Sequence, residues 1–223
     1  MSFDALIRVE NSTVLNKRIK KSIGNKVKNI LEAITQIEQA SGFKYPAYYV
    51  EPILTIVPSV DNVEGGVGVL YARTIPVEVQ GKVIIIVELS APLVLYATKT
   101  SLKVVLAHEL LHYVELVRNF STMNLTSQIT TSSIFEEKYT DYARAIDPAL
   151  VFKEKRFAKS IAKKTSHGFD DPKLNQKCKE KWMEKGLPVR KIALGTNQVS
   201  VGVESVLRSD FDPKVKELIS RIH

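Results

Sequence analysis

Residues 100–117 read TSLKVVLAHELLHYVELV, and this segment decides the fold of the chain. From Leu102 to Val117 it contains neither Gly nor Pro, and Thr100 or Ser101 can serve as an N-cap. Its apolar residues recur at helical spacing: Leu102, Val105, Leu106, Leu110, Tyr113, Val114 and Val117. The pattern therefore predicts a long helix with most of its surface buried.

This helix contains the motif His108-Glu109-Leu110-Leu111-His112, or HExxH. Residues i and i+4 lie on one face of a helix, so both imidazoles can reach a single Zn²⁺ at about 2.0–2.1 Å. Glu109 lies at the flank of that face, where a carboxylate can deprotonate a water that the metal activates. We predict one zinc ion per chain, with His108 and His112 as ligands and Glu109 as the catalytic base.

The alternative is a pair of core histidines that are hydrogen-bonded to the backbone. Composition alone, in a chain with 4 His, gives this motif by chance only roughly 0.005 times. Burying two His and a Glu without partners is also costly. The metal interpretation is therefore preferred.

Catalytic zinc normally has three protein ligands and one water. The chain resembles the thermolysin-like, or gluzincin, branch of the HExxH metallopeptidases, in which a Glu on a later helix is the third ligand. That Glu lies in an ExxxD pattern whose Asp braces the first His. Glu137 to Asp141 read EKYTD, 25 residues after His112. The resemblance implies that Glu137 is the third ligand and that Asp141 orients His108.

A different family pattern, HExxHxxGxxH, is not met. Glu115 stands where its Gly would be, and Arg118 stands where its third His would be.

Glu136 is the rival third ligand. Ser133 and Glu136 have the spacing of a capping box, which predicts a helix over residues 134–146 and gives Glu136 a local role at its start. Glu137 has no such role and shares a face with Asp141, so we prefer Glu137. A further alternative is that Glu137 and Asp141 are solvated helix charges.

The resemblance also implies a downstream His or Tyr that hydrogen-bonds the oxyanion of the tetrahedral intermediate. His167 is the candidate imidazole, in a predicted loop, and it can equally be an ordinary surface residue. The phenolic alternatives are Tyr96, Tyr139 and Tyr142.

The first half of the chain alternates helical and β-type sequence. A helix over 17–40 ends at Gly42, and a short helical piece over 92–98 precedes the motif helix. The Gln80-Gly81-Lys82 turn predicts a hairpin. We expect strands over residues 48–57 with an interruption at Pro52, over 67–79, and over 83–89, the last of these buried or central.

The second half is mostly helical. We expect helices over 134–146, 148–164 and 172–185, extended chain over 191–208, and a final helix from Pro213 to Ile222. The predicted fold class is α+β: an N-terminal helix and mixed β-sheet lobe, then the HExxH helix, then a mostly helical C-terminal lobe.

This order of elements is similar to the zincin fold. The resemblance implies one zincin-like domain over 1–223, with lobes of about 1–118 and 119–223 and the metal at the floor of a cleft between them. The peptide or protein substrate would pair with a strand edge, for which residues 67–73 and 83–89 are both candidates.

Charge is concentrated in one segment. Residues 151–191 hold 13 Lys and Arg against 5 Asp and Glu, an excess equal to the chain's whole net charge of +8. A smaller basic cluster spans residues 17–28. Such patches attract polyanions, so nucleic acid is a candidate partner of the 151–191 segment, whereas lysines that only maintain solubility are the alternative.

Two rival functions follow. One is a basic SprT-type protease that acts on DNA-bound proteins. The other is a catalytically silent scaffold whose zinc has its fourth position closed, with Cys178 as one candidate.

Cellular location is inferred from what the sequence lacks. It has no apolar run of about 18 residues, no signal-like start and a single Cys. We therefore expect a cytoplasmic protein that does not span a membrane, of undetermined oligomeric state.

Overall fold

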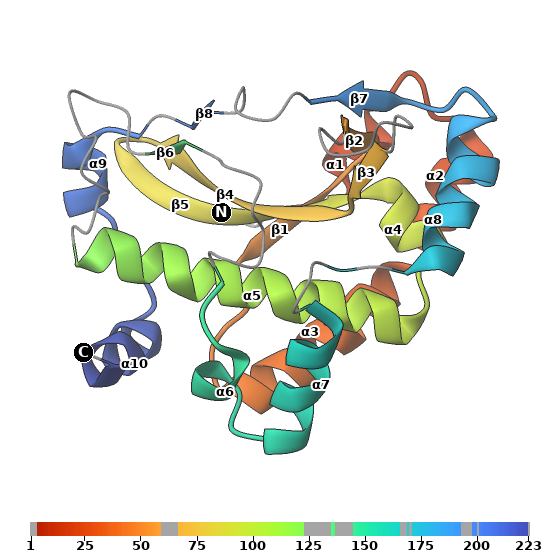
Figure 1. The fold of residues 1–223 in the computed structure, drawn as a ribbon. Helices are drawn as coiled ribbons and strands as arrows, with labels where there is room; N and C mark the ends of the chain where they lie inside the picture. Colours follow the sequence, from red (N-terminus) through yellow and green to blue (C-terminus); the bar gives the residue numbers. More distant parts are fainter. Residues whose placement is uncertain are drawn as a thin grey trace.

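The computed structural model describes residues 4–58, 67–122, 135–136, 145–165, 169, 171–192, 198–199 and 201–222. It has the predicted α+β class, with helices and strands mixed along the chain. The long helix α5 (Lys99–Ser121) crosses the molecule, with a curved sheet on one side and helices on the other (Figure 1). Within the described residues, no helix combines the length and apolar character needed to cross a membrane.

Helix α5 confirms the predicted motif helix and is longer than expected. Most of its 23 residues are buried, including His108 and Glu109. Its N-cap is Thr98, whose hydroxyl accepts a hydrogen bond from the Ser101 backbone at 3.0 Å. The prediction of Thr100 or Ser101 as N-cap is therefore wrong, because the N-cap lies two or three residues earlier.

The sheet beside α5 has the strand order β1-β5-β4, made by β1 (Ala47–Glu51), β5 (Lys82–Ser90) and β4 (Ala72–Val79). Strand β1 runs parallel to β5, and β4 runs antiparallel to it. The hairpin is confirmed: Gln80 and Gly81 both have positive φ, 52° and 70°, as a two-residue turn of this hand requires. Residues 67–73 and 83–89 were the two candidates for a strand edge that pairs with a peptide substrate. Because β5 lies in the centre of its sheet, residues 83–89 cannot supply such an edge.

A second sheet has the order β3-β2-β7, made by β3 (Val67–Leu70), β2 (Leu54–Pro58) and β7 (Val189–Lys191). Strand β2 pairs in parallel with β7, so chain from the second half completes a sheet begun in the first. The predicted strand over 48–57 is thus confirmed, with the break at Pro52 separating β1 from β2.

The two sheets are joined by charged side chains around Glu88. Arg73 donates two hydrogen bonds to its carboxylate, both at 3.0 Å, and Tyr49 donates a third at 2.6 Å. Arg190 of β7 donates to the same carboxylate and to Thr55 of β2, each at 3.0 Å. Burial alone would raise the pKa of Glu88, but Arg73, with Tyr49 and Arg190, lowers it below its ordinary value.

We expect Glu88→Gln to lower the free energy of unfolding by about 1–3 kcal/mol near pH 7, because two partly buried cations lose their counter-charge. Since the folded-state pKa of Glu88 is lowered, its contribution is complete above the unfolded pKa of about 4.3. The contribution is lost as pH falls through the folded pKa. Denaturant unfolding at neutral and acid pH tests this, with Glu204→Gln in the exposed pair to Arg208 as control. An equal loss at both pH values would contradict it.

The helices before α5 differ in one place from the expected single helix. They are α1 (Ile7–Glu10), α2 (Lys17–Gly24), α3 (Val27–Ser41) and α4 (Ala91–Tyr96). The predicted helix over 17–40 is broken at Asn25 and Lys26, which separate α2 from α3. Gly42 does end α3, in a left-handed conformation with φ of 82°.

After α5 come α6 (Pro148–Val151), α7 (Lys155–Thr165), α8 (Pro172–Cys178), the π-helical turn η2 (Lys179–Met183), α9 (Val203–Leu207) and α10 (Pro213–Ile222). The final helix is as predicted. The helix expected over 148–164 is divided between α6 and α7, and the extended chain expected over 191–208 contains α9 instead.

One prediction in this half is wrong in a way that matters for the site. Phe135 and Glu136 form strand β6, paired antiparallel with β8 (Gln198–Val199), where a helix over 134–146 was expected. Pairing with a distant segment overrides the local capping pattern. Glu136 is therefore not in the first turn of a helix, and the capping role that distinguished it from Glu137 does not exist.

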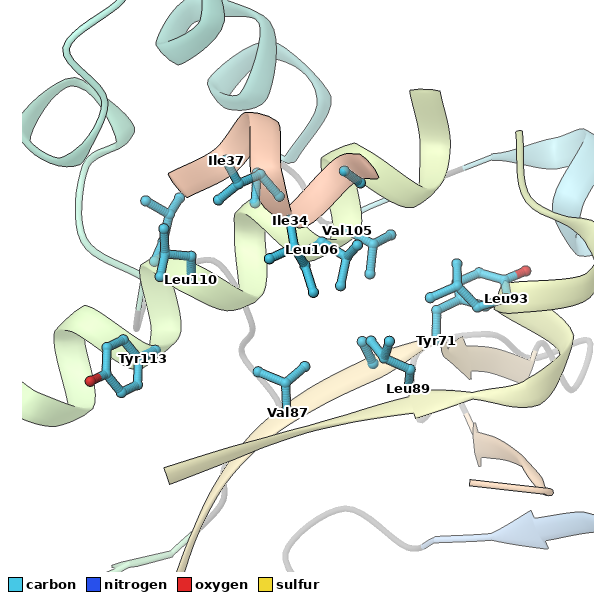
Figure 2. Packing of buried hydrophobic residues seen from close by; sticks show 14 of the residues in the cluster. Ile34, Ile37, Tyr71, Val87, Leu89, Leu93, Val105, Leu106, Leu110 and Tyr113 are labelled. Carbon is cyan, nitrogen blue, oxygen red and sulfur yellow. The ribbon is translucent and has the colours of Figure 1, made fainter. Parts of the chain in front are cut away.

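The core lies on both sides of α5. Ile34 and Ile37 of α3 pack near Leu106 and Leu110 of α5, while Val87 and Leu89 of β5 lie across the helix from them (Figure 2). Alternation along β5 turns Glu88 to the opposite face, toward the second sheet. The helix α5 is thus enclosed by α3 and the sheet.

Two residues of α3 test this packing. Ile37 is 0% exposed and Leu31 is 52% exposed. Ile37→Ala should lower the free energy of unfolding by about 2–5 kcal/mol through the cavity it leaves. Leu31→Ala should change it by less than about 0.5 kcal/mol. Urea unfolding of both variants measures the difference, and similar values would show that α3 does not pack as described.

Candidate metal centre

Helix α5 directs the two motif imidazoles at each other. The Nε2 atoms of His108 and His112 lie 3.1 Å apart. The rings meet edge to face, with an interplanar angle of 78° and centroids 4.6 Å apart. His108 is 4% exposed and His112 is half-buried. The helical spacing therefore brings two nitrogen ligands to one point at the boundary of the core.

This geometry fits a shared zinc ion. Two Zn–N bonds of about 2.0–2.1 Å at a tetrahedral angle place the nitrogens about 3.3–3.4 Å apart. The observed 3.1 Å separation needs only a small ring rotation to reach that value. Imidazole nitrogens are also the ligands that zinc prefers, along with thiolate and carboxylate.

Glu109 is held on the sheet side of α5. The hydroxyl of Thr74, on β4, lies 2.6 Å from Oε2 of Glu109 and 3.1 Å from its backbone carbonyl oxygen. A hydroxyl has one proton, and the shorter contact to the charged carboxylate is the stronger acceptor site. The Glu109 carboxylate, 4% exposed, is thereby tied to the strand that faces the helix.

Tyr45, which follows α3 in the chain, also contacts helix α5. Its hydroxyl donates a hydrogen bond to the Leu106 carbonyl at 2.9 Å, two residues before the motif. Burial raises the pKa of Tyr45 well above its ordinary value, and the charge of Glu109 raises it further. Both effects favour the neutral phenol, the form that donates the hydrogen bond to Leu106.

Sequence reasoning did not identify Thr74 or Tyr45. Neither belongs to a motif, and each reaches α5 from a separate element. The available signal was the alternation of β4, which turns Thr74 to one face and its neighbour Arg73 to the other. This alternation predicts a contact between Thr74 and Glu109 only if β4 is already known to pack against α5.

The remaining predicted site residues are not placed by the structure. Glu137, Asp141 and His167 lie outside the described residues, as do Tyr139 and Tyr142. The backbone of Glu136 is described, in β6. Within the described ranges, His, Cys, Asp and Glu side chains form no metal-binding group of three or more, so a third ligand beside His108 and His112 stays a prediction.

Two other candidates are engaged elsewhere. The Tyr96 hydroxyl donates to the Lys181 carbonyl at 3.1 Å. Cys178 is fully buried in the core where α8 packs on α4, and burial raises its pKa to about 11. Cys178 is thus a core thiol of α8 that packs toward α4, on an element separate from the motif helix α5.

Comparison with known proteins adds no assignment: no family model matches the chain, and no curated protein or solved structure matches it.

Removing the contact between Thr74 and Glu109 should lower the free energy of unfolding by a measurable amount. Thr74→Val keeps the shape of the side chain but withdraws the hydroxyl from a buried carboxylate. We expect the free energy of unfolding to fall by about 1–3 kcal/mol. Thr74→Ser keeps the donor and should lose less than half as much. Urea unfolding of the pair tests this, and an equal loss in Thr74→Ser would contradict the expectation, because the methyl group would then contribute as much as the hydroxyl.

Proposed function

We propose that the chain is a zinc-dependent peptidase of the gluzincin type, with a zincin-like arrangement of helix and sheet. The observation that carries the proposal is the convergence of the His108 and His112 Nε2 atoms beside the buried carboxylate of Glu109. His108 and His112 would hold the metal together with one later carboxylate. Glu137 is our preferred third ligand from its match to the ExxxD pattern, and Glu136 stays open.

When bound, zinc supplies a Lewis acid that polarises a carbonyl group and makes water acidic enough to lose a proton near neutral pH. Glu109 would accept the proton of the attacking water on its carboxylate and pass it to the leaving amine. Thr74 orients the carboxylate through Oε2. Asp141 would orient His108, and His167 or a tyrosine would donate to the developing oxyanion, as the family resemblance implies.

Strand β4 is the edge at which we place the substrate. Among the described strands, β4 pairs with β5 on one side only. The Ser90 backbone donates to the Tyr71 carbonyl at 2.9 Å, so in this register Arg73 and Ile75 also pair with β5. The backbone groups of Thr74 then face outward. An extended peptide added to this edge would pair with Thr74, whose side chain holds Glu109.

The decisive experiment combines metal content with cleavage of an unfolded polypeptide. We expect wild type to contain one zinc per chain and to lose cleavage on treatment with a chelator. Glu109→Gln should keep its zinc and lose at least about 10²-fold in kcat, because the general base is gone. Glu115→Gln on the same helix, where Glu115 pairs with Arg118 at 2.5 Å, is the matched control and should keep activity.

The outcomes separate the possible roles of the site. Wild-type turnover by Glu109→Gln would overturn the general-base role. Purified protein without metal would overturn the zinc site. Stoichiometric zinc with no cleavage by wild type would instead favour the silent scaffold, in which the metal only stabilises the fold.

A further inference from the structure

The structure divides the basic 151–191 segment into parts of different character. Helix α7 carries five cations, all exposed and with no acidic residue inside the helix: Lys155, Arg156, Lys159, Lys163 and Lys164. The turn η2 and the two residues after it carry a mixture instead, in which Glu180 and Glu184 alternate with exposed lysines. The excess positive charge is therefore concentrated on α7, with Glu154 just before its start.

The cations of α7 cover one half of the helix. At about 100° per residue, they span an arc of about 180° from Lys155 to Lys164. The other half holds Ala158, Ile161 and Thr165, which are buried against the rest of the protein. Helix α7 packs on α6 and α5 and projects away from the sheet (Figure 1). The result is a charged half-cylinder that faces solvent.

The cations of α7 form no ion pairs with acidic side chains among the described residues. Other helices pair their surface cations within one turn, as with Arg118 and Glu115, Arg208 and Glu204, and Arg221 and Glu217. Helix α2 has three exposed cations, fewer than α7. A surface that concentrates unpaired charge in this way attracts a polyanion.

We propose that the α7 half-cylinder binds the phosphate backbone of duplex DNA without sequence specificity. An α-helix with its side chains is about 10–12 Å across, which fits the width of about 12 Å of the major groove of B-form DNA. The narrow major groove of duplex RNA does not admit a helix. The apolar half of α7 is buried, so this helix cannot insert into a membrane. Ser160 is the only uncharged residue on the exposed arc of α7. The arc therefore has few side chains that could recognise base edges specifically.

The test is fluorescence anisotropy of a labelled 20-base-pair duplex with the full chain, between 50 and 200 mM salt. Each phosphate contact contributes about 0.9 to the slope of log Kobs against log salt. Lys155→Gln, Lys159→Gln and Lys163→Gln together should flatten that slope by about 2.7 and weaken binding at 50 mM roughly 10-fold or more. Circular dichroism confirms that the variant is folded.

The matched control removes the same number of charges elsewhere. Lys179→Gln, Lys181→Gln and Lys185→Gln together should change the affinity less than about 2-fold. Equal losses in the two variants would overturn the proposal, because net charge alone would then explain binding. So would absence of wild-type binding at 50 mM salt, or tighter binding to phosphatidylserine vesicles than to DNA. The Glu109→Gln protein should bind DNA as wild type does, so this proposal and the peptidase can fail separately.

Discussion

The constraint on which the rest of the structure depends is that α5 must be enclosed. It is apolar around most of its circumference, and a helix of that kind is stable only when other elements cover it. The sheet β1-β5-β4 covers one side, and α3 covers the other (Figure 2). This enclosure carries His108 and Glu109 into the interior, where a polar side chain persists only with hydrogen-bonding partners or a metal. The candidate site is thus a direct consequence of how the core is built.

Sequence reasoning succeeded where the signal is local. The periodicity of α5, the β-branched run of β5 and the turn at Gln80 and Gly81 each involve neighbours in the chain, and each is confirmed. It failed where distant segments meet. Strand β6 replaces the start of a predicted helix because Phe135 and Glu136 pair with β8, about 60 residues later. No window of local sequence contains that partner.

The candidate site shows the same division. His108 and His112 share a helix, so their convergence follows from a spacing of four residues. Thr74 and Tyr45 come from other elements, and only the packing of β4 and of the chain after α3 brings them to α5. Under the proposed function, Glu109 would be a base held by a strand and His108 and His112 would be ligands held by a helix, so the geometry would be set before any substrate arrives. Such preorganisation is what acid–base chemistry needs from a fold.

The parallel pairing of β2 with β7 has a consequence for biosynthesis. Arg190 bonds to Thr55 across 135 residues of chain, so the second sheet cannot close until β7 has left the ribosome. Until then β2 presents an unpaired edge, and Glu88 lacks its contact with Arg190. Contacts so far apart in sequence slow folding, because the loop entropy is lost before the pairing forms. During translation the nascent chain would therefore expose an unpaired strand edge that is prone to aggregate. Chaperones shield segments of this kind.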